Sequence, residues 1–167
     1  NTKTYPMINE YRVYQHNQFD NRWIILMMPT EWMYELIEAW YPNTTWNPYG
    51  RQISIFNSYE FSKGRNTYAE IGGCYYSARL AVNELLNKEK RQAGIVVLRE
   101  AHPGYIMPIG VWNVRESVRK ALTEPYKKFT ELESCFEKFV LIEHNSLNNN
   151  VKSNCYSFTS QSQESLK

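Results

Sequence analysis

The chain has 167 residues, enough for one domain with a hydrophobic core, and 43% of them are hydrophobic and 22% charged. These proportions are average for a globular protein and argue against a disordered, collagen-like or coiled-coil chain. The net charge of +2 excludes a basic field over the whole surface, so any site for a polyanion must be a local cluster. Aromatic residues make up 15% of the chain, and rings on that scale fill a core or form a stacking surface.

The cysteines and histidines are widely spaced along the chain. Cys74, Cys135 and Cys155 form no C-x-x-C pair, and the 3 histidines lack metal-binding spacing. We therefore expect a reducing compartment and neither a disulfide framework, a metal site nor a cofactor. No apolar run reaches the roughly 18 residues of a membrane span. The sequence thus predicts a soluble, cytoplasmic protein with no membrane contact, and Asn1 at its start indicates a piece of a longer polypeptide.

The first half of the chain predicts two strands, a helix and a loop. Residues 1–21 are polar and Tyr-rich, which indicates an irregular lead-in or an edge strand. Arg22–Met28 is a continuous apolar run closed by a proline, the pattern of a buried strand. From Glu31 to Trp40 the apolar residues recur at intervals of three and four, which predicts a helix. The Pro- and Asn-containing stretch 41–50 predicts a loop, and Gln52–Phe56 a strand.

The second half predicts alternating helices and strands. A glycine pair precedes a periodic helix expected from residue 75 to residue 90, and Ala93–Leu98 reads as a second buried strand. A loop rich in Pro and Gly is expected over Arg99–Gly110, followed by a helix over Val111–Ala121.

The end of the chain changes character. A last helix is predicted from Thr130 to about Ile142, and residues 143–167 are rich in Asn, Ser and Gln, which predicts a disordered tail. We therefore expect one α/β domain over residues 1–142, a mixed or mostly parallel sheet covered by helices, followed by the tail.

The largest group of residues suited to chemistry lies after the second predicted strand. In open α/β sheets, ligands gather at the carboxyl ends of strands, and the following helix N-terminus offers free N–H groups and a partial positive charge. The sequence therefore predicts a phosphate or nucleic-acid site here. Its candidate residues are Arg99, Glu100, His102, Tyr105, Asn113 and Arg115. The alternative is that Arg99 and Glu100 form ion pairs with residues of the helix and only fasten the loop.

A second candidate segment contains Arg65 and the pair Gly72-Gly73. Glycines before a helix let the backbone approach a ligand closely, although a tight turn explains the same pair. We hypothesise one site in which Arg65, Arg99 and Arg115 hold phosphate, backbone donors near Gly73 assist, and Glu100 or His102 moves any proton. Cys74 could serve as a nucleophile, but no spacing in the sequence requires it.

Aromatic residues are concentrated between residues 32 and 49. If some are exposed, they form a platform on which bases stack, with Arg51 and Arg65 nearby for phosphates; the alternative is that they fill the core. The rings are Trp32, Trp40, Tyr41, Trp46 and Tyr49.

Three stretches together resemble a known family. They are Tyr34–Pro42 running on to Trp46-Asn47-Pro48, then Arg65–Val82 (RNTYAEIGGCYYSARLAV), and Arg91–Leu122 with its core VLREAHPGYIMPIGVWNVRESVRKAL. From about Phe19 to Pro125 the chain is similar to the C-terminal domain of the archaeal Nre proteins, a family assigned to DNA repair. The cysteine-rich N-terminal region of that family is expected to have no counterpart here.

The resemblance implies a role in the response to DNA damage, with DNA and the replication sliding clamp (PCNA) as partners. Members often end in a clamp-binding peptide Q-x-x-[LIM]-x-x-aromatic-aromatic. Gln163 and Leu166 match its first half, and the chain stops at Lys167 before the aromatic pair. The resemblance supplies no reaction. Two other classes of function stay open: an enzyme acting on a nucleotide or another anion through a Glu/His/Arg site, and a non-enzymatic recruitment module.

Overall fold

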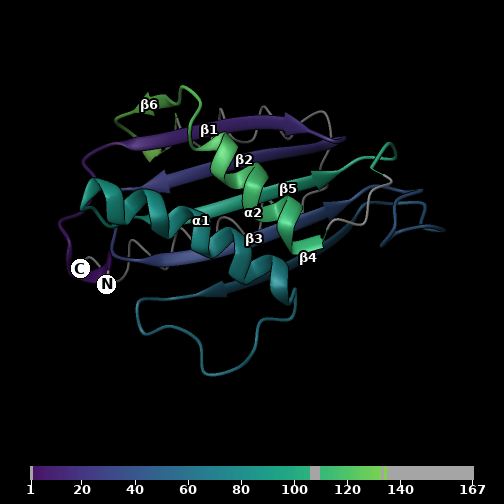
Figure 1. Ribbon diagram of the computed structural model, residues 1–167, viewed down its shortest axis with the longest axis horizontal. Coiled ribbons are helices and arrows are strands. Elements are labelled where there is room, and N and C mark those ends of the chain that lie inside the picture. Colours follow the sequence, from purple (N-terminus) through teal and green to yellow (C-terminus); the bar gives the residue numbers. More distant parts are fainter. Residues whose placement is uncertain (1, 106–109, 133, 135–167) are drawn as a thin grey trace.

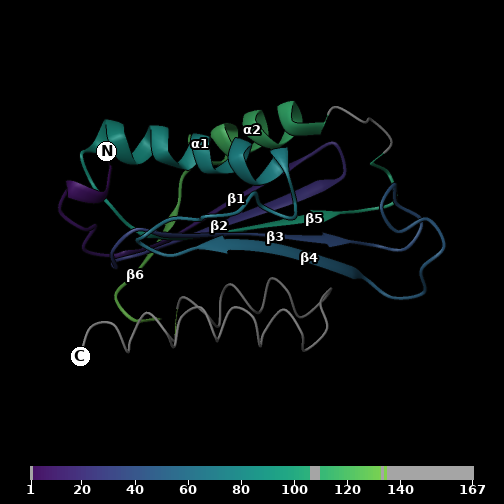
Figure 2. The same ribbon diagram turned by 90° about the horizontal axis from the view of Figure 1, so that it is seen from below.

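A six-stranded sheet with two helices packed on one face forms the core of the chain (Figures 1 and 2). In this computed structural model, residues 2–105, 110–132 and 134 are described. The elements are a short 3-10 helix η1 (Thr2–Thr4), strands β1 (Tyr11–Gln18), β2 (Asn21–Met28), β3 (Met33–Trp40), β4 (Ser54–Glu60), β5 (Gly94–Ala101) and β6 (Lys127–Phe129), and helices α1 (Gly73–Glu89) and α2 (Gly110–Ala121).

The strand order is β4-β3-β5-β2-β1-β6. β3 and β5 run parallel, while β1–β2, β1–β6, β2–β5 and β3–β4 are antiparallel. The expected α/β class and mixed sheet are therefore confirmed, but a mostly parallel sheet is wrong. The reason lies in the connections, because β1 and β2 are joined by a tight turn, which can only link antiparallel neighbours.

Both helices lie on the same face of the sheet, as Figure 2 shows. Their apolar sides pack on alternate residues of the central strands, which include Trp23, Leu36 and Val97. The intervening residues of the same strands, such as Ile24, Ile37 and Leu98, form a separate apolar cluster on the opposite face. The central strands are thus buried on both faces, which explains their continuous apolar runs. Within the described residues, no helix is long and apolar enough to cross a membrane.

The predicted helix over Glu31–Trp40 is wrong, because Met33–Trp40 is strand β3. All eight of its residues are buried. When both faces of a strand are buried, apolar residues occur at odd and even positions alike, and a spacing of three and four arises without a helix. Leu36 packs under the helices and Ile37 packs on the other side of the sheet. The two residues, which the helix prediction placed on one face, therefore belong to opposite faces.

Several other boundaries differ from expectation. The opening segment contains β1, which is paired with β2 along its length and with β6 at one end, so it is neither irregular nor an edge strand. β4 begins two residues later than predicted, and β5 continues through Ala101, which places Arg99 and Glu100 in a strand and not in a loop. The strands predicted at 22–28 and 93–98 are confirmed, and so are the helices predicted from residue 75 to residue 90 and over Val111–Ala121. Most of the helix predicted over 130–142, and the whole tail, lie outside the described residues.

A buried carboxyl group on β3 links the fold to pH. Glu35 is 2% exposed, and burial raises its pKa to about 7, although a hydrogen bond from Asn57 Nδ2 at 2.8 Å acts against this rise. Because the folded pKa exceeds the unfolded one, the folded state holds the proton more tightly. The stability that this group contributes is greatest when the pH is below its unfolded pKa of about 4.3, and it is lost as the pH rises through its folded pKa of about 7.

We expect Glu35→Gln to raise the free energy of unfolding at pH 8 by up to about 3 kcal/mol, the equivalent of the shift in pKa, and to change it little at pH 4.5. Glutamine keeps an acceptor for Asn57 and carries no charge to desolvate. Urea unfolding at the two pH values measures the difference, with exposed Glu31→Gln as the control. An equal effect of Glu35→Gln at both pH values would contradict the assignment.

Candidate functional site

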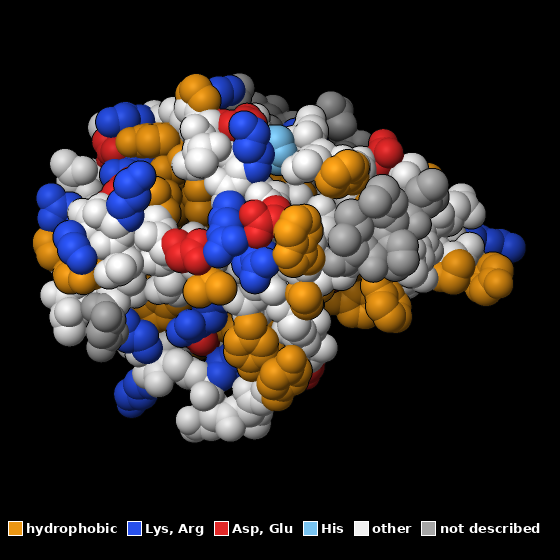
Figure 3. Space-filling view, viewed as in Figure 1, with side chains coloured by type: hydrophobic (Ala, Val, Ile, Leu, Met, Phe, Trp, Pro, Cys, Tyr) orange, Lys and Arg blue, Asp and Glu red, His pale blue; other side chains and the backbone are white. Residues whose placement is uncertain are grey.

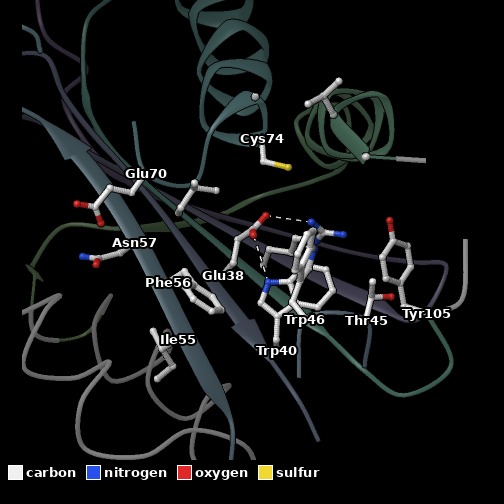
Figure 4. A pocket seen from close by; sticks show the side chains of 15 residues that line it. Glu38, Trp40, Thr45, Trp46, Ile55, Phe56, Asn57, Glu70, Cys74 and Tyr105 are labelled. Atoms are coloured by element: carbon white, nitrogen blue, oxygen red, sulfur yellow. Dashed lines mark hydrogen bonds and ion pairs between the residues drawn. The ribbon is translucent and has the colours of Figure 1, made fainter. Parts of the chain in front are cut away.

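A cavity of about 600 Å³ lies where β3 and β5 end and where both helices begin (Figure 4). The loop between β3 and β4 and the first residues of β4 complete its wall. Its lining consists of Glu38, Trp40, Thr45, Trp46, Ile55, Phe56, Asn57, Glu70, Ile71, Gly73, Cys74, Arg99, Tyr105, Gly110 and Val111. Its volume lies within the usual range for small-molecule and cofactor sites, and aromatic and aliphatic groups dominate its lining.

A buried ion pair belongs to this lining. Arg99 Nη1 lies 2.9 Å from Glu38 Oε1, and these side chains are 2% and 7% exposed. The two residues are direct neighbours across the parallel β3–β5 pair. Arg99 Nε donates to Asn21 Oδ1 at 2.8 Å, and Trp40 Nε1 donates to Glu38 Oε2 at 3.2 Å. The pair thus joins β2, β3 and β5 at the carboxyl ends of β3 and β5.

Aromatic rings surround the guanidinium group. The Arg99 Cζ atom lies 5.3 Å from the ring centroid of Trp23, 4.8 Å from that of Trp40 and 5.1 Å from that of Tyr105. Rings at this distance attract a cation through their quadrupoles, which offsets part of the cost of burying it. Arg99 Nη2, however, is buried and has no hydrogen-bond partner among the described residues. Nη2 itself has almost no accessible surface, so an acceptor atom of a ligand in the cavity reaches it only when the surrounding side chains shift.

The N-terminal turns of both helices also reach the cavity. Gly73 and Cys74 of α1 and Gly110 and Val111 of α2 line it. Neither helix has an acidic residue in its first turn, and no side chain caps α1. The N-terminus of α1 therefore brings a partial positive charge to the cavity without a side-chain cap, although the carboxyl-bearing residue Glu70 also belongs to the lining. The two helices meet closely at this junction, because a Cβ on Gly73 would lie 2.5 Å from Cγ1 of Val111 and would force one of the two side chains to shift.

Cys74 is a lining residue and not a poised nucleophile. Figure 4 shows its side chain above Glu38. Burial, reinforced by the charge of Glu38, raises the pKa of the thiol to about 11. The thiolate fraction at neutral pH is therefore very small, which is the opposite of what nucleophilic catalysis needs.

The structure brings some of the predicted site residues together. Gly73, Arg99 and Tyr105, which come from different segments of the sequence, all line the cavity. Asn113 supports it from behind, since its Nδ2 lies 3.5 Å from the Tyr105 hydroxyl. Gly72 caps α1 with a φ of 73°, a left-handed conformation that favours glycine, so its role here is conformational.

Glu100 and His102 do not reach the cavity. Side chains alternate along β5, so Glu100 faces the side of the sheet opposite Arg99. There its Oε2 atom lies 3.7 Å from Arg22 Nη1 and 3.2 Å from His102 Nε2. His102 stacks on Tyr41 with ring centroids 4.2 Å apart and lines a separate hollow near the β1–β2 turn. Glu100 and His102 therefore lie apart from Arg99 and are grouped with Arg22 instead.

Arg65 and Arg115 also lie outside the cavity lining. The Arg65 guanidinium group donates hydrogen bonds to backbone carbonyl oxygens, and its Nη1 lies 2.6 Å from the oxygen of Tyr59. Arg115 Nε pairs with Glu116 Oε1 at 3.0 Å on the exposed side of α2. The predicted convergence of three arginines on one phosphate is therefore not seen; of the three, Arg99 alone lines the cavity. Gln163 and Leu166 lie outside the described residues.

Sequence reasoning missed Glu38, the partner that holds Arg99. The signal was present, because Glu38 interrupts an apolar run that is buried on both faces, and a buried charge needs a partner. The wrong helix prediction for this segment concealed it.

Trp46 was identified as a possible stacking ring, and it is 69% exposed at the cavity wall, whereas Trp32 is 1% exposed and fills the core. Within the described residues, no three His, Cys, Asp or Glu side chains gather in a group that could hold a metal ion.

The sequence comparisons define the class of protein first. A family model described as "Archaeal Nre, C-terminal" matches residues 60–167, and one described as "Archaeal Nre, N-terminal" matches residues 1–47. The chain therefore belongs to the archaeal Nre family. The expectation that the family's N-terminal region has no counterpart is wrong. No solved structure matches the chain.

Named relatives agree with this assignment. The chain is 46% identical over 131 residues to "DNA repair protein NreB" of Archaeoglobus fulgidus, which covers 78% of this chain and 33% of the relative. It is 34% identical over 118 residues to "DNA repair protein NreA" of the same organism, covering 71% and 30%. To "DNA repair protein NreA" of Haloferax volcanii it is 34% identical over 116 residues, covering 68% and 28%. The chain thus spans about a third of the length of these relatives.

The two family segments share one sheet. β1, β2 and β3 belong to the N-terminal match, while α1, β5 and α2 belong to the C-terminal match. β5 lies between β3 and β2, so one strand of the C-terminal match is inserted among those of the N-terminal match. Glu38 comes from one segment and Arg99 from the other, and the cavity therefore needs both.

We expect the Arg99–Glu38 pair to behave as a strongly coupled unit. Arg99→Met should lower the free energy of unfolding by about 3 to 5 kcal/mol, because it leaves a buried carboxylate unpaired, and adding Glu38→Met should recover much of that loss. Urea unfolding of both single variants and the double variant measures the coupling. The half-buried Arg115–Glu116 pair, whose side chains are 33% and 39% exposed, is the control, with an expected coupling below about 1 kcal/mol. Additive losses at Arg99 and Glu38 would refute the coupling.

Proposed function

We propose that this chain is part of a DNA-repair protein and that the cavity around Arg99 receives one unpaired base of DNA. The repair role rests on the family and on the printed names of the relatives. The observation that carries the cavity assignment is the buried Nη2 of Arg99, which no described residue pairs with, beside an aromatic-lined opening.

The chemistry of the cavity suits the edge of a nucleobase. Arg99 Nη2 is a donor, and the carboxylate of Glu38 next to it has acceptor capacity left after its bonds to Arg99 and Trp40. A donor beside an acceptor matches the alternating pattern on a Watson–Crick edge. The neighbouring rings offer π-faces for stacking, which contributes about 1 to 3 kcal/mol per base. A free anion fits this position less well, because Glu38 would repel it.

The entrance suits the sugar–phosphate backbone. The N-terminal turns of α1 and α2 border the cavity and bring partial positive charge without an acidic residue in either first turn. A phosphate next to the bound base would lie within this field. Because the net charge of the chain is only +2, we expect few phosphate contacts and a shallow dependence of affinity on salt.

The remaining partners are proposed from the family. We place the replication sliding clamp (PCNA) as a partner through Gln163 and Leu166, and we place the protein in the cytoplasm with the DNA it serves. The division into a folded part over residues 1–142 and a polar tail over 143–167 stays a prediction. The chain covers 33% of the length of its NreB relative, and the proposal therefore names no reaction for the whole protein.

Filling the cavity should abolish recognition of the base. We expect Cys74→Phe to weaken binding of a fluorescent single-stranded oligonucleotide at least about tenfold, the loss of one base stack with its hydrogen bonds. The new ring has room in the 600 Å³ cavity, so the fold should survive. Fluorescence anisotropy measures affinity, and circular dichroism checks the fold. The control is Tyr68→Ala, which removes an exposed ring that does not line the cavity.

The same titration separates the other classes of function. An oligonucleotide of abasic residues keeps the phosphates and should bind at least about ten times more weakly than one with bases. Tight binding of a mononucleotide without binding of the oligonucleotide would favour a small-molecule enzyme. Equal binding of the abasic strand, or full affinity in folded Cys74→Phe, would overturn the proposal.

A further inference from the structure

The loop between β3 and β4 presents two aromatic side chains to solvent. Tyr49 is 96% exposed and Trp46 is 69% exposed, while Thr44 and Asn47 of the same loop are buried. A large ring with almost its whole surface in water gains nothing from the fold of this chain. The loop thus buries two of its polar residues, Thr44 and Asn47, and presents the rings of Trp46 and Tyr49 to solvent.

Hydrogen bonds inside the loop fix its shape. Asn47 Nδ2 donates to the carbonyl oxygens of Trp40 and Gln52 at 2.9 and 2.7 Å, and its backbone N–H donates to the oxygen of Thr44 at 3.0 Å. Gly50 packs on the side-chain amide of Asn47 so closely that any Cβ there would collide with it. Tyr49 lies between these two fixed residues. Its backbone is therefore held in place before any partner binds, which lowers the entropic cost of binding.

The loop stands at the mouth of the cavity and suits a polyanion. Thr45 and Trp46 belong to the cavity lining. No Asp or Glu occurs between Glu38 and Glu60, and the charged residue within that stretch is Arg51. In Figure 3 the loop extends from the body of the molecule at the right, with hydrophobic side chains and a basic one at its end. An exposed ring with a neighbouring arginine and no carboxylate is compatible with the interior of a DNA duplex.

We propose that Tyr49 is a wedge that enters the base stack of duplex DNA and fills the space left by the base that moves into the cavity. This inference rests on the proposed function. Extruding a base costs a few kcal/mol of lost stacking and pairing, and an inserted apolar or aromatic side chain offsets part of that cost. Trp46 belongs to the same loop and lines the cavity, so we place it on the path of the extruded nucleotide, with Arg51 near the flanking phosphates.

The experiment compares a paired base with one that is already unpaired. A duplex carries 2-aminopurine opposite a mismatched base, because the fluorescence of this analogue rises when it leaves the stack; the same strand is also used alone. We expect Tyr49→Ala to remove the fluorescence rise and to weaken duplex binding about tenfold, while single-strand affinity changes less than about twofold. Tyr49→Phe should restore both duplex signals, because the wedge needs the ring and not the hydroxyl. The matched control, Tyr68→Ala, should behave as the unsubstituted chain does.

Three outcomes would overturn the wedge. The first is a full fluorescence rise and full duplex affinity in Tyr49→Ala. The second is an equal loss on duplex and single strand, which would make Tyr49 an ordinary stacking surface. The third is a loss of the duplex signals in Tyr49→Phe, which would assign the effect to the hydroxyl. Failure of the proposed function looks different, because the unsubstituted chain and Cys74→Phe would then bind the single strand equally.

Discussion

The buried pair of Arg99 and Glu38 is the interaction on which the rest of the site depends. It joins the parallel strands β3 and β5 in register, and Asn21 and the ring of Trp23 extend it to β2. Burying both charges costs free energy, and the surrounding rings and hydrogen bonds offset that cost incompletely, since Nη2 has no hydrogen-bond partner in the described part of the chain. Among the described residues, this leaves a buried charged donor next to the cavity, and the proposed function assigns an acceptor of the ligand to it.

The same pair explains why the two family segments must fold together. Glu38 lies in the segment that matches the N-terminal model and Arg99 in the one that matches the C-terminal model. Because β5 is inserted between β3 and β2, neither segment can form the central strands of this sheet by itself. The boundary between the two matches, residues 48–59, coincides with the end of the exposed loop and most of β4, so it does not divide this part of the chain into two structural domains.

The sequence correctly predicted the elements whose apolar residues lie on one face, and it failed for a strand whose apolar residues lie on both faces. α1 and α2 have a single buried face, and their periodicity located them correctly. β3 is buried on both faces, so its spacing imitated a helix and concealed Glu38. In the candidate site, Gly73, Arg99 and Tyr105 were identified as ligand-binding candidates. Arg99 and Glu100 face opposite sides of the sheet because side chains alternate along β5. The sequence predicted a loop for both residues, so it could not indicate that they point in opposite directions.

Three groups of aromatic residues serve different purposes. Trp23, Trp32 and Tyr34 fill the core beneath the helices, Trp40 and Tyr105 enclose the guanidinium of Arg99, and Trp46 and Tyr49 project from a fixed loop. Composition alone gives no means of separating these roles, because burial is decided by pairing partners far away in the sequence. The third group distinguishes this chain from one that uses its rings only for packing.

A crystal structure of the chain with a duplex oligonucleotide that contains one mismatch tests the central claim most directly. The account predicts one base in the cavity, with an acceptor atom about 3 Å from Arg99 Nη2 and a ring of the cavity against its face. An oligonucleotide bound elsewhere on the surface, with the cavity empty and Nη2 still unpaired, would contradict it.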